Sequence, residues 1–203
     1  PYEVIKLVRD KVKIEDQAAK AEIINIEENG TTVKLGVISI PSFYNDFSGR
    51  RTGDQNFKST TKDVRKILDS LKTENIDGVI IDLRNNGGGS LQEAIELTGL
   101  FIEEGPIVQV KQANGAIEVD DDPDPQIVYD GPLAVIINRF SASASEIFAG
   151  AIQDYDRGLI LGEQTYGKGT VQNLIDLNRF LPSSGDKFGQ VKLTIAKFYR
   201  ITG

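Results

Sequence analysis

The chain contains no histidine, no cysteine, no methionine and no tryptophan. Without histidine it has no Ser-His-Asp triad, no imidazole base and no histidine-ligated metal site. Without cysteine it has no disulfide, no thiolate nucleophile and no cysteine-ligated metal site. If the chain is an enzyme, its general base must therefore be a lysine, an aspartate, a glutamate or a tyrosine.

Positive charge is also scarce, because the 203 residues carry 23 Lys and Arg against 30 Asp and Glu, a net charge of −7. Nucleic-acid and anionic-membrane binders present a basic face, so this balance argues against both. No run approaches the roughly 18 apolar residues of a transmembrane helix, and no charged-then-apolar leader is present. Because methionine is absent, residue 1 cannot be the translational start, and we expect a processed or partial chain.

Short apolar runs alternate with helical patterns through the middle of the chain, and both ends are rich in β patterns. The continuous apolar runs, typical of buried parallel strands, are at 35–40, 79–83, 133–137 and 159–161. One helical pattern runs to about residue 73, with Thr60 and Thr61 as candidate caps and an apolar stripe at 64, 67, 68 and 71. Two more begin after 89 and after 141. The alternation predicts an α/β fold with mostly parallel β layers and packed helices. We expect one main domain over 30–203 and a β-rich N-terminal appendage over 1–29.

The segment FSASASE (140–146) follows one of these strands and opens a predicted helix. A helix N-terminus offers unpaired N–H groups and positive potential. A serine there can act as a nucleophile while adjacent amides hold the developing oxyanion. The more ordinary role of such a serine is the helix N-cap. Both roles can coexist on different serines, with Ser145 as the cap.

The segment GEQTYGKGT (162–170) matches the front of a phosphate-binding loop. Gly169 replaces the Ser or Thr that must follow the lysine, and a strand-like run comes next, so we expect no nucleotide binding. Lys168 is instead the nitrogen base available to a serine. An ordinary lysine has a pKa of about 10.4. To act as a base, its pKa must fall by about 3 units, which corresponds to roughly 4 kcal/mol of destabilisation of the charged form. Burial in an apolar cleft can supply this. The alternative is a surface lysine in a Gly-rich turn.

A Gly-rich turn follows the strand at 79–83, in the order Asn85-Asn86-Gly87-Gly88-Gly89. Glycines here permit positive φ and close backbone approach. The turn can supply an oxyanion amide or a groove for a substrate backbone, or it can be a tight strand-to-helix connection. The acidic stretch 120–125 lacks the features of a calcium loop and predicts a solvated turn. Arg50-Arg51 predicts a solvated loop, with a mobile lid as the alternative.

Three segments together resemble the tail-specific, or C-terminal processing, serine peptidases. They are IDLRNNGGGSLQEA, NRFSASASEIFAGAIQDYDRGLILGEQTYGKGTVQ and KFYRITG, and the similarity covers roughly 9–203. The resemblance implies a Clp protease/crotonase-like α/β core. It also implies the site residues: Ser143 as nucleophile, Lys168 as general base, Gln172 to orient that lysine, and oxyanion amides from Ala144 and from Gly89 or else Gly88.

The same resemblance implies a serine endopeptidase that degrades or processes proteins recognised by a nonpolar C-terminal tail. It implies no metal, cofactor or nucleotide, a location in the bacterial periplasm, with or without association with the inner membrane, and activity that rises with pH. The family carries a PDZ domain before the segment that resembles 9–20, and we expect this chain to begin where that domain ends. Two alternatives stay open: a crotonase-like acyl-CoA enzyme, and a non-catalytic peptide-binding module.

Overall fold

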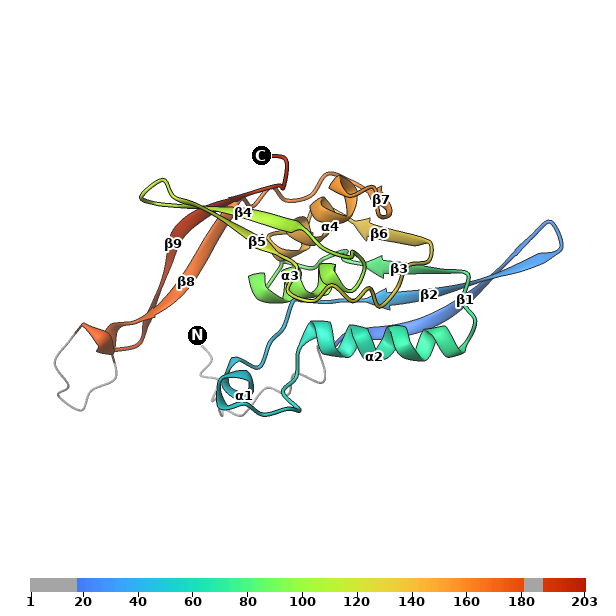
Figure 1. Cartoon of the computed structure of the whole chain (residues 1–203), viewed down its shortest axis with the longest axis horizontal. Helices are drawn as coiled ribbons and strands as arrows, with labels where there is room; N and C mark the ends of the chain where they lie inside the picture. Colours follow the sequence, from blue (N-terminus) through green and yellow to red (C-terminus); the bar gives the residue numbers. More distant parts are fainter. Residues whose placement is uncertain (1–17, 181–187) are drawn as a thin grey trace, which may run out of the picture.

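The strands form two sheets in the computed structural model, which describes residues 18–180 and 188–203 (Figure 1). The five-stranded sheet has the order β1-β2-β3-β6-β7, and the four-stranded sheet has the order β5-β4-β9-β8. The first sheet contains β1 (Lys20–Glu28), β2 (Thr31–Ser39), β3 (Gly78–Asp82), β6 (Leu133–Ile137) and β7 (Leu159–Gly162). The second contains β4 (Pro106–Gln112), β5 (Ile117–Asp121), β8 (Thr170–Asp176) and β9 (Gln190–Tyr199).

The apolar runs form the parallel part of the first sheet, as predicted. The β layers as a whole are mixed and not mostly parallel, because β1 pairs with β2 in antiparallel orientation and all pairs of the second sheet are antiparallel. β2, β3, β6 and β7 pair in parallel, and Ile38, Ile81 and Val135 are fully buried along the central strands. The prediction that 159–161 is a buried strand is wrong. β7 is the edge strand, so Leu159 is 68% exposed and Leu161 is 47% exposed. A short apolar run does not reveal whether a second strand covers its outer side.

Four α-helices and one 3₁₀ turn connect the described strands: α1 (Phe47–Thr52), α2 (Thr60–Thr73), α3 (Leu91–Gly99), α4 (Ala144–Asp154) and η2 (Leu177–Arg179). The predicted helix at 60–73 is confirmed, but its N-cap is Ser59 rather than a threonine. The Ser59 hydroxyl accepts a hydrogen bond from the Lys62 N–H at 3.3 Å. Thr60 and Thr61 are buried and bond to other segments.

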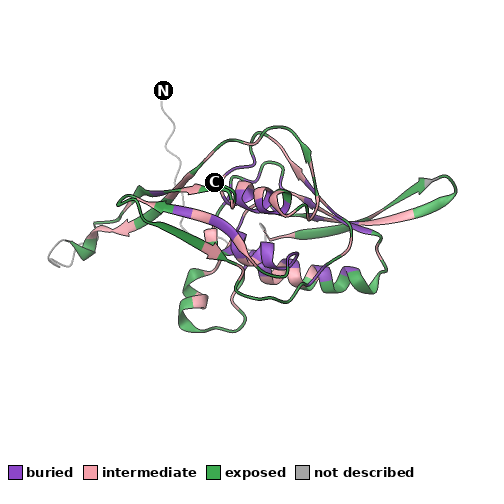
Figure 2. Cartoon of the chain, turned by 45° about the horizontal axis from the view of Figure 1, so that its top comes forward, coloured by how far each residue is buried: buried purple, intermediate pink, exposed green. Residues whose placement is uncertain are grey.

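The core lies where α3 and α4 meet the sheets. The two helices contact each other, and both contact β4 of the second sheet. Phe148 on α4 packs edge-on against Phe101 with ring centroids 5.9 Å apart, and lies 6.5 Å from Phe43. Buried residues gather in these helices and in the strands beside them (Figure 2). The turns that precede α3 and α4 carry the predicted nucleophile Ser143 and the glycines of the Gly-rich turn, so the packed core supports that part of the site.

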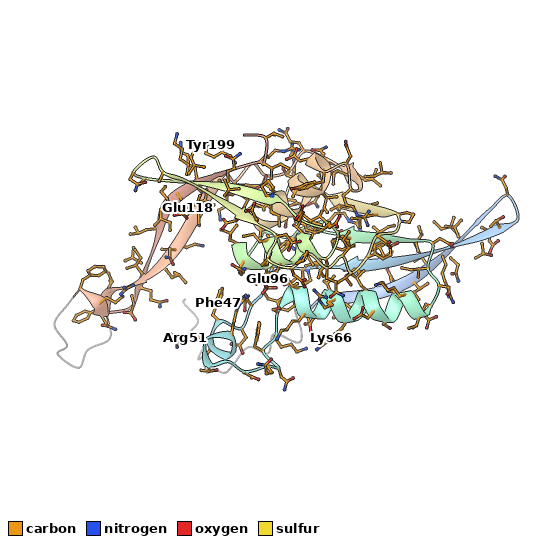
Figure 3. All side chains as sticks on the ribbon, viewed as in Figure 1. Phe47, Arg51, Lys66, Glu96, Glu118 and Tyr199 are labelled. Atoms are coloured by element: carbon orange, nitrogen blue, oxygen red, sulfur yellow. The ribbon has the colours of Figure 1, made fainter. Side chains whose placement is uncertain are left out.

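The 41–60 segment is tied to the helices. Arg50 on α1 forms an ion pair with Glu93 at 3.5 Å and a second pair with Glu96, both on α3. Figure 3 shows Glu96 between α3 and α1. The expectation of a solvated Arg50 is therefore wrong, because the two carboxylates on α3 hold its guanidinium, while Arg51 is exposed as expected.

The N-terminal part that the structure describes belongs to the first sheet. β1 pairs with β2 along its full length through a hairpin turn at Asn29 (φ 50°) and Gly30 (φ 81°), the turn that the sequence indicates. Residues 1–17 of the β-rich appendage expected over 1–29 lie outside the described residues. Over 18–180 and 188–203, no helix is long and apolar enough to cross a membrane.

Candidate active site

Ser143 stands at the turn between β6 and α4. It is the N-cap of α4, with φ 59° and ψ −113°. A residue with a Cβ rarely adopts this backbone region, and holding it there costs on the order of 1–3 kcal/mol. Gly88 packs closely against this turn, since a Cβ added at Gly88 would lie 2.7 Å from the Cβ of Ser143, so position 88 needs glycine. The strained turn places a half-buried serine at the N-terminus of α4.

The other two serines of the motif have structural partners. The Ser141 hydroxyl donates to the carbonyl oxygen of Leu83 at 2.8 Å, and the Ser145 hydroxyl donates to the carbonyl oxygen of Asn86 at 3.0 Å. Both serines are fully buried. The expectation that Ser145 caps the helix is therefore wrong, because its hydroxyl bonds to the Gly-rich turn and Ser143 occupies the cap position.

Asn86 joins the Gly-rich turn to the serine turn. Its side-chain amide donates to the carbonyl oxygen of Ile40 at 2.8 Å, and its side-chain oxygen accepts from the Gly88 N–H at 2.9 Å. Its backbone oxygen accepts from the Ala142 N–H at 2.9 Å. Sequence reasoning missed this fully buried residue, because nothing in the pattern separates it from its exposed neighbour Asn85.

Gly89 passes against the backbone of Phe43. A Cβ at Gly89 (φ 149°) would lie 2.2 Å from the Phe43 carbonyl oxygen, so the turn needs glycine here. That oxygen accepts from the Ser90 N–H at 2.8 Å, and the Phe43 N–H donates to Gly88 at 3.0 Å. Among the described residues, no hydrogen-bond acceptor takes the N–H of Gly89. The N–H of Ala144, in the first turn of α4, has no intrahelical partner.

Glu146 connects the serine turn to the loop that carries Lys168. Its Oε2 accepts from the Ser143 N–H at 2.6 Å and from the Lys168 N–H at 2.9 Å. Its Oε1 accepts from the Gly167 N–H at 2.6 Å. Sequence reasoning did not assign this residue, although Ser143 and Glu146 have the S-x-x-E spacing of a capping box. The carboxylate fixes the backbones of the two predicted dyad residues relative to each other.

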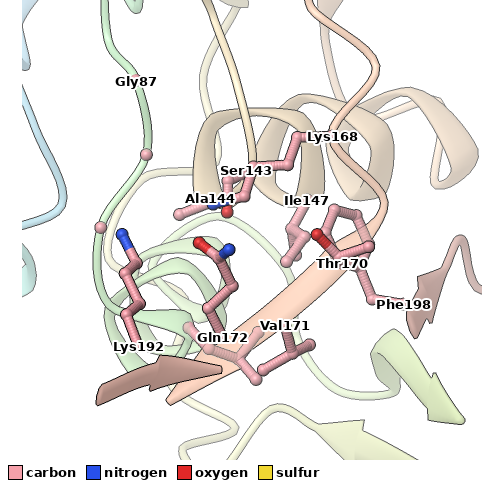
Figure 4. A pocket seen from close by; sticks show the side chains of 13 residues that line it. Gly87, Ser143, Ala144, Ile147, Lys168, Thr170, Val171, Gln172, Lys192 and Phe198 are labelled. Carbon is pink, nitrogen blue, oxygen red and sulfur yellow. The ribbon is translucent and has the colours of Figure 1, made fainter. Parts of the chain in front are cut away.

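A cleft of about 380 Å³ brings together every residue predicted for the site. This volume lies in the range of roughly 300–1,000 Å³ typical of ligand sites. Figure 4 shows the Lys168 side chain running toward Ser143, with Gln172 and Lys192 reaching in from the other side. The lining residues are Gly87, Gly88, Gly89, Leu91, Ser143, Ala144, Ile147, Lys168, Thr170, Val171, Gln172, Lys192 and Phe198.

Strands β8 and β9 supply the outer wall of this cleft. Their pairing shifts register between Val171 and Gln172, an irregularity that re-aims the side chains that follow. Beyond it, Gln172 pairs with Thr194 and Leu174 pairs with Lys192. Gln172 and Lys192 therefore lie on one face of the ribbon. Sequence analysis anticipated Gln172 but not Lys192.

The family model described as Peptidase family S41 matches residues 34–203. The chain belongs to peptidase family S41. This S41 chain is 48% identical over 200 residues to the tail-specific protease of Haemophilus influenzae, a match that covers 98% of the chain and 26% of that protein. It is 33% identical over 208 residues to the carboxy-terminal processing protease CtpA of Bacillus subtilis. That match covers 99% of the chain and 42% of the Bacillus protein.

Among solved structures, the S41 chain resembles a photosystem II D1 C-terminal processing protease with a TM-score of 0.72 and 27% identity. This match covers 98% of the chain and 47% of that structure. Mature CPAF in complex with lactacystin shares the fold, with a TM-score of 0.66 and 19% identity. The family resemblance and the α/β fold predicted from the sequence are confirmed. The chain spans between about a quarter and a half of the length of these relatives.

Proposed function

We propose that the protein containing this chain is a serine endopeptidase with a Ser-Lys dyad. The observation that carries the proposal is a cleft, in a chain without histidine, that holds a strained serine at a helix N-terminus together with a lysine and two available amides. Serine with lysine is one variant of the triad chemistry. Membership of peptidase family S41 supports the same reaction class and does not favour an acyl-CoA enzyme or a binding module.

In the proposed mechanism, neutral Lys168 takes the proton of Ser143 as the serine oxygen attacks the scissile carbonyl. The N–H groups of Ala144 and Gly89 stabilise the oxyanion. Gly89 is preferred over Gly88 because the Gly88 N–H already donates to Asn86. Protonated Lys168 then gives a proton to the leaving amine, and water hydrolyses the acyl-enzyme. Gln172 lines the same cleft from β8, and its proposed role is to orient the lysine.

We further propose that the substrates are proteins with nonpolar C-terminal tails, cleaved in the bacterial periplasm. The names of the tail-specific and carboxy-terminal processing relatives support protein substrates recognised at that end. A PDZ domain outside this chain would select the tail, because such domains bind C-terminal peptides by strand addition and capture of the terminal carboxylate.

The proposal is tested by substituting the two dyad residues in the full-length protein. Ser143→Ala and Lys168→Ala are each expected to abolish cleavage of a protein with a nonpolar tail. A boronate or fluorophosphonate probe should label the unsubstituted protein at Ser143. Lys197→Ala, on the same β9 strand that carries part of the cleft but outside its lining, is the matched control and should retain activity. Retained turnover in either dyad variant would contradict the assignment.

A further inference from the structure

Lys192 places a cation in the active-site cleft that the proposed dyad does not use. It lies on β9 and lines the cleft with Ser143 and the Gly-rich turn. In Figure 4 its side chain extends toward that turn, beside Gln172. The strand register explains the direction. Lys192 and Thr194 are two residues apart and so point to the same face, and they pair with Leu174 and Gln172 of β8.

The charge of the cleft is opposite to that of the chain. Its lining contains Lys168 and Lys192 and no aspartate or glutamate, in a chain with 30 acidic and 23 basic residues. Within the described residues, no carboxylate forms an ion pair with Lys192. In the proposed mechanism Lys168 acts as a neutral base, so Lys192 is the positive charge that remains in the lining of the cleft. Such a charge attracts an anionic group into the cleft.

We propose that Lys192 is a specificity-determining residue that binds a carboxylate of the peptide being cleaved. The inference rests on the proposed peptidase function and names a substrate preference of the same site. A lysine ammonium is a flexible point charge with three donors, so it binds a carboxylate without demanding one orientation. A peptide offers that group in two places, at the side chain of an Asp or Glu near the scissile bond and at its own C-terminus.

The test measures kcat/KM of the full-length protein on matched peptides. One series replaces a single Glu near the cleavage site with Gln, position by position, and a second amidates the C-terminus. The unsubstituted protein should cleave the carboxylate-bearing peptide about 5- to 20-fold better than its neutral match, as expected for a charge-assisted bond that is partly exposed to water. The series in which the preference appears identifies which carboxylate Lys192 binds.

Two variants of Lys192 and one control make the result specific. Lys192→Gln should bring the ratio of acidic to neutral peptide close to one. Lys192→Glu should reverse it in favour of a peptide with Lys at the same position. Lys197→Gln removes the same charge from the same strand but faces a different pocket, beside Lys111, and should keep the ratio and the activity.

The inference is overturned if the unsubstituted protein shows no preference in either series, or if Lys192→Gln keeps the preference. Failure of the proposed function gives a different result. In that case the unsubstituted protein cleaves no peptide and the boronate probe does not label Ser143, and the inference fails together with the function.

Discussion

At the scale of single residues, the carboxylate of Glu146 holds the serine turn and the lysine loop in one geometry. It accepts hydrogen bonds from the N–H groups of Ser143, Gly167 and Lys168 at 2.6 to 2.9 Å. A carboxylate can do this because both of its oxygens only accept, whereas a glutamine side chain would direct an NH₂ group at an N–H donor. Glu146 is therefore a positioning residue for the proposed dyad.

Glu146→Gln is expected to lower kcat of the full-length protein by about 10- to 100-fold while KM changes little, because small misplacements of reacting groups are costly. Steady-state kinetics on a single peptide measures both constants. Glu163→Gln is the matched control, since it removes an exposed carboxylate from the same loop. The prediction fails if Glu146→Gln lowers the melting temperature but leaves kcat unchanged, because a purely structural role would give that result.

The sequence was sufficient to predict the cleft residues whose own side chains would take part in the reaction. The absence of histidine pointed to Lys168 as the base, whereas the choice of Ser143 among the serines of its motif came from the family resemblance. Asn86 and Glu146 could not, because they act on backbone groups contributed by other segments. Lys192 could not be placed either, because its position depends on the strand register after an irregularity in β8.

At the scale of elements, a buried acid joins α1, α2 and α3. The side chain of Glu93 on α3 is fully buried, its Oε2 accepts from the Thr61 N–H at 2.8 Å, and Arg50 lies 3.5 Å from its other oxygen. Burial raises the pKa of the Glu93 carboxyl above its usual range, against the lowering effect of the hydrogen bonds from Thr61. The contact of α3, the helix that follows the Gly-rich turn, with α1 and α2 therefore includes a group that titrates.

The raised pKa of Glu93 predicts how stability depends on pH. The native state keeps this proton at a higher pH than the unfolded chain does, so it binds more protons and the free energy of unfolding falls as pH rises above about 4.5. Glu93→Gln removes this titration and can keep the bond from Thr61. Urea unfolding at several pH values from 4 upward should show the stability of the variant relative to the unsubstituted protein increasing with pH. A difference that stays constant over the range would contradict the prediction.

The elements themselves were largely predictable, and the exceptions have physical causes. The apolar stripe at positions 64, 67, 68 and 71 predicted α2, and the structure buries 64, 68 and 71, and 67 in part. The short helix α1 was not predicted, since its six residues have no buried face and it depends on the cap at Asp46 and on the ion pairs of Arg50. The edge position of β7 depends on the order of the strands in space, which a single run does not encode.

At the scale of the whole molecule, one wall of the cleft belongs to the packed core and the other belongs to a two-stranded ribbon that few other elements contact. Ser143 and the Gly-rich turn stand on the packed core between α3, α4 and the first sheet. Gln172 and Lys192 stand on the β8–β9 ribbon, which extends away from the core in Figure 1. β9 pairs with β4 only from Ala196 to Tyr199, so its outer half pairs with β8 alone. Two-stranded β structure without further cover has little stability of its own.

This unequal support predicts a pattern of amide hydrogen exchange. Amides in the outer half of the β8–β9 ribbon should exchange at least about 100-fold faster than those of the central strands β3 and β6, because local opening needs only the ribbon to separate. A boronate bound to Ser143 should fill the cleft and slow exchange around Gln172 and Lys192. The outer part of the β1–β2 hairpin is the internal control, because it is also two-stranded but does not line the cleft. Slowing confined to β8–β9 is the expected result, because the ligand stabilises the wall that it contacts. Equal slowing in both hairpins would contradict the prediction.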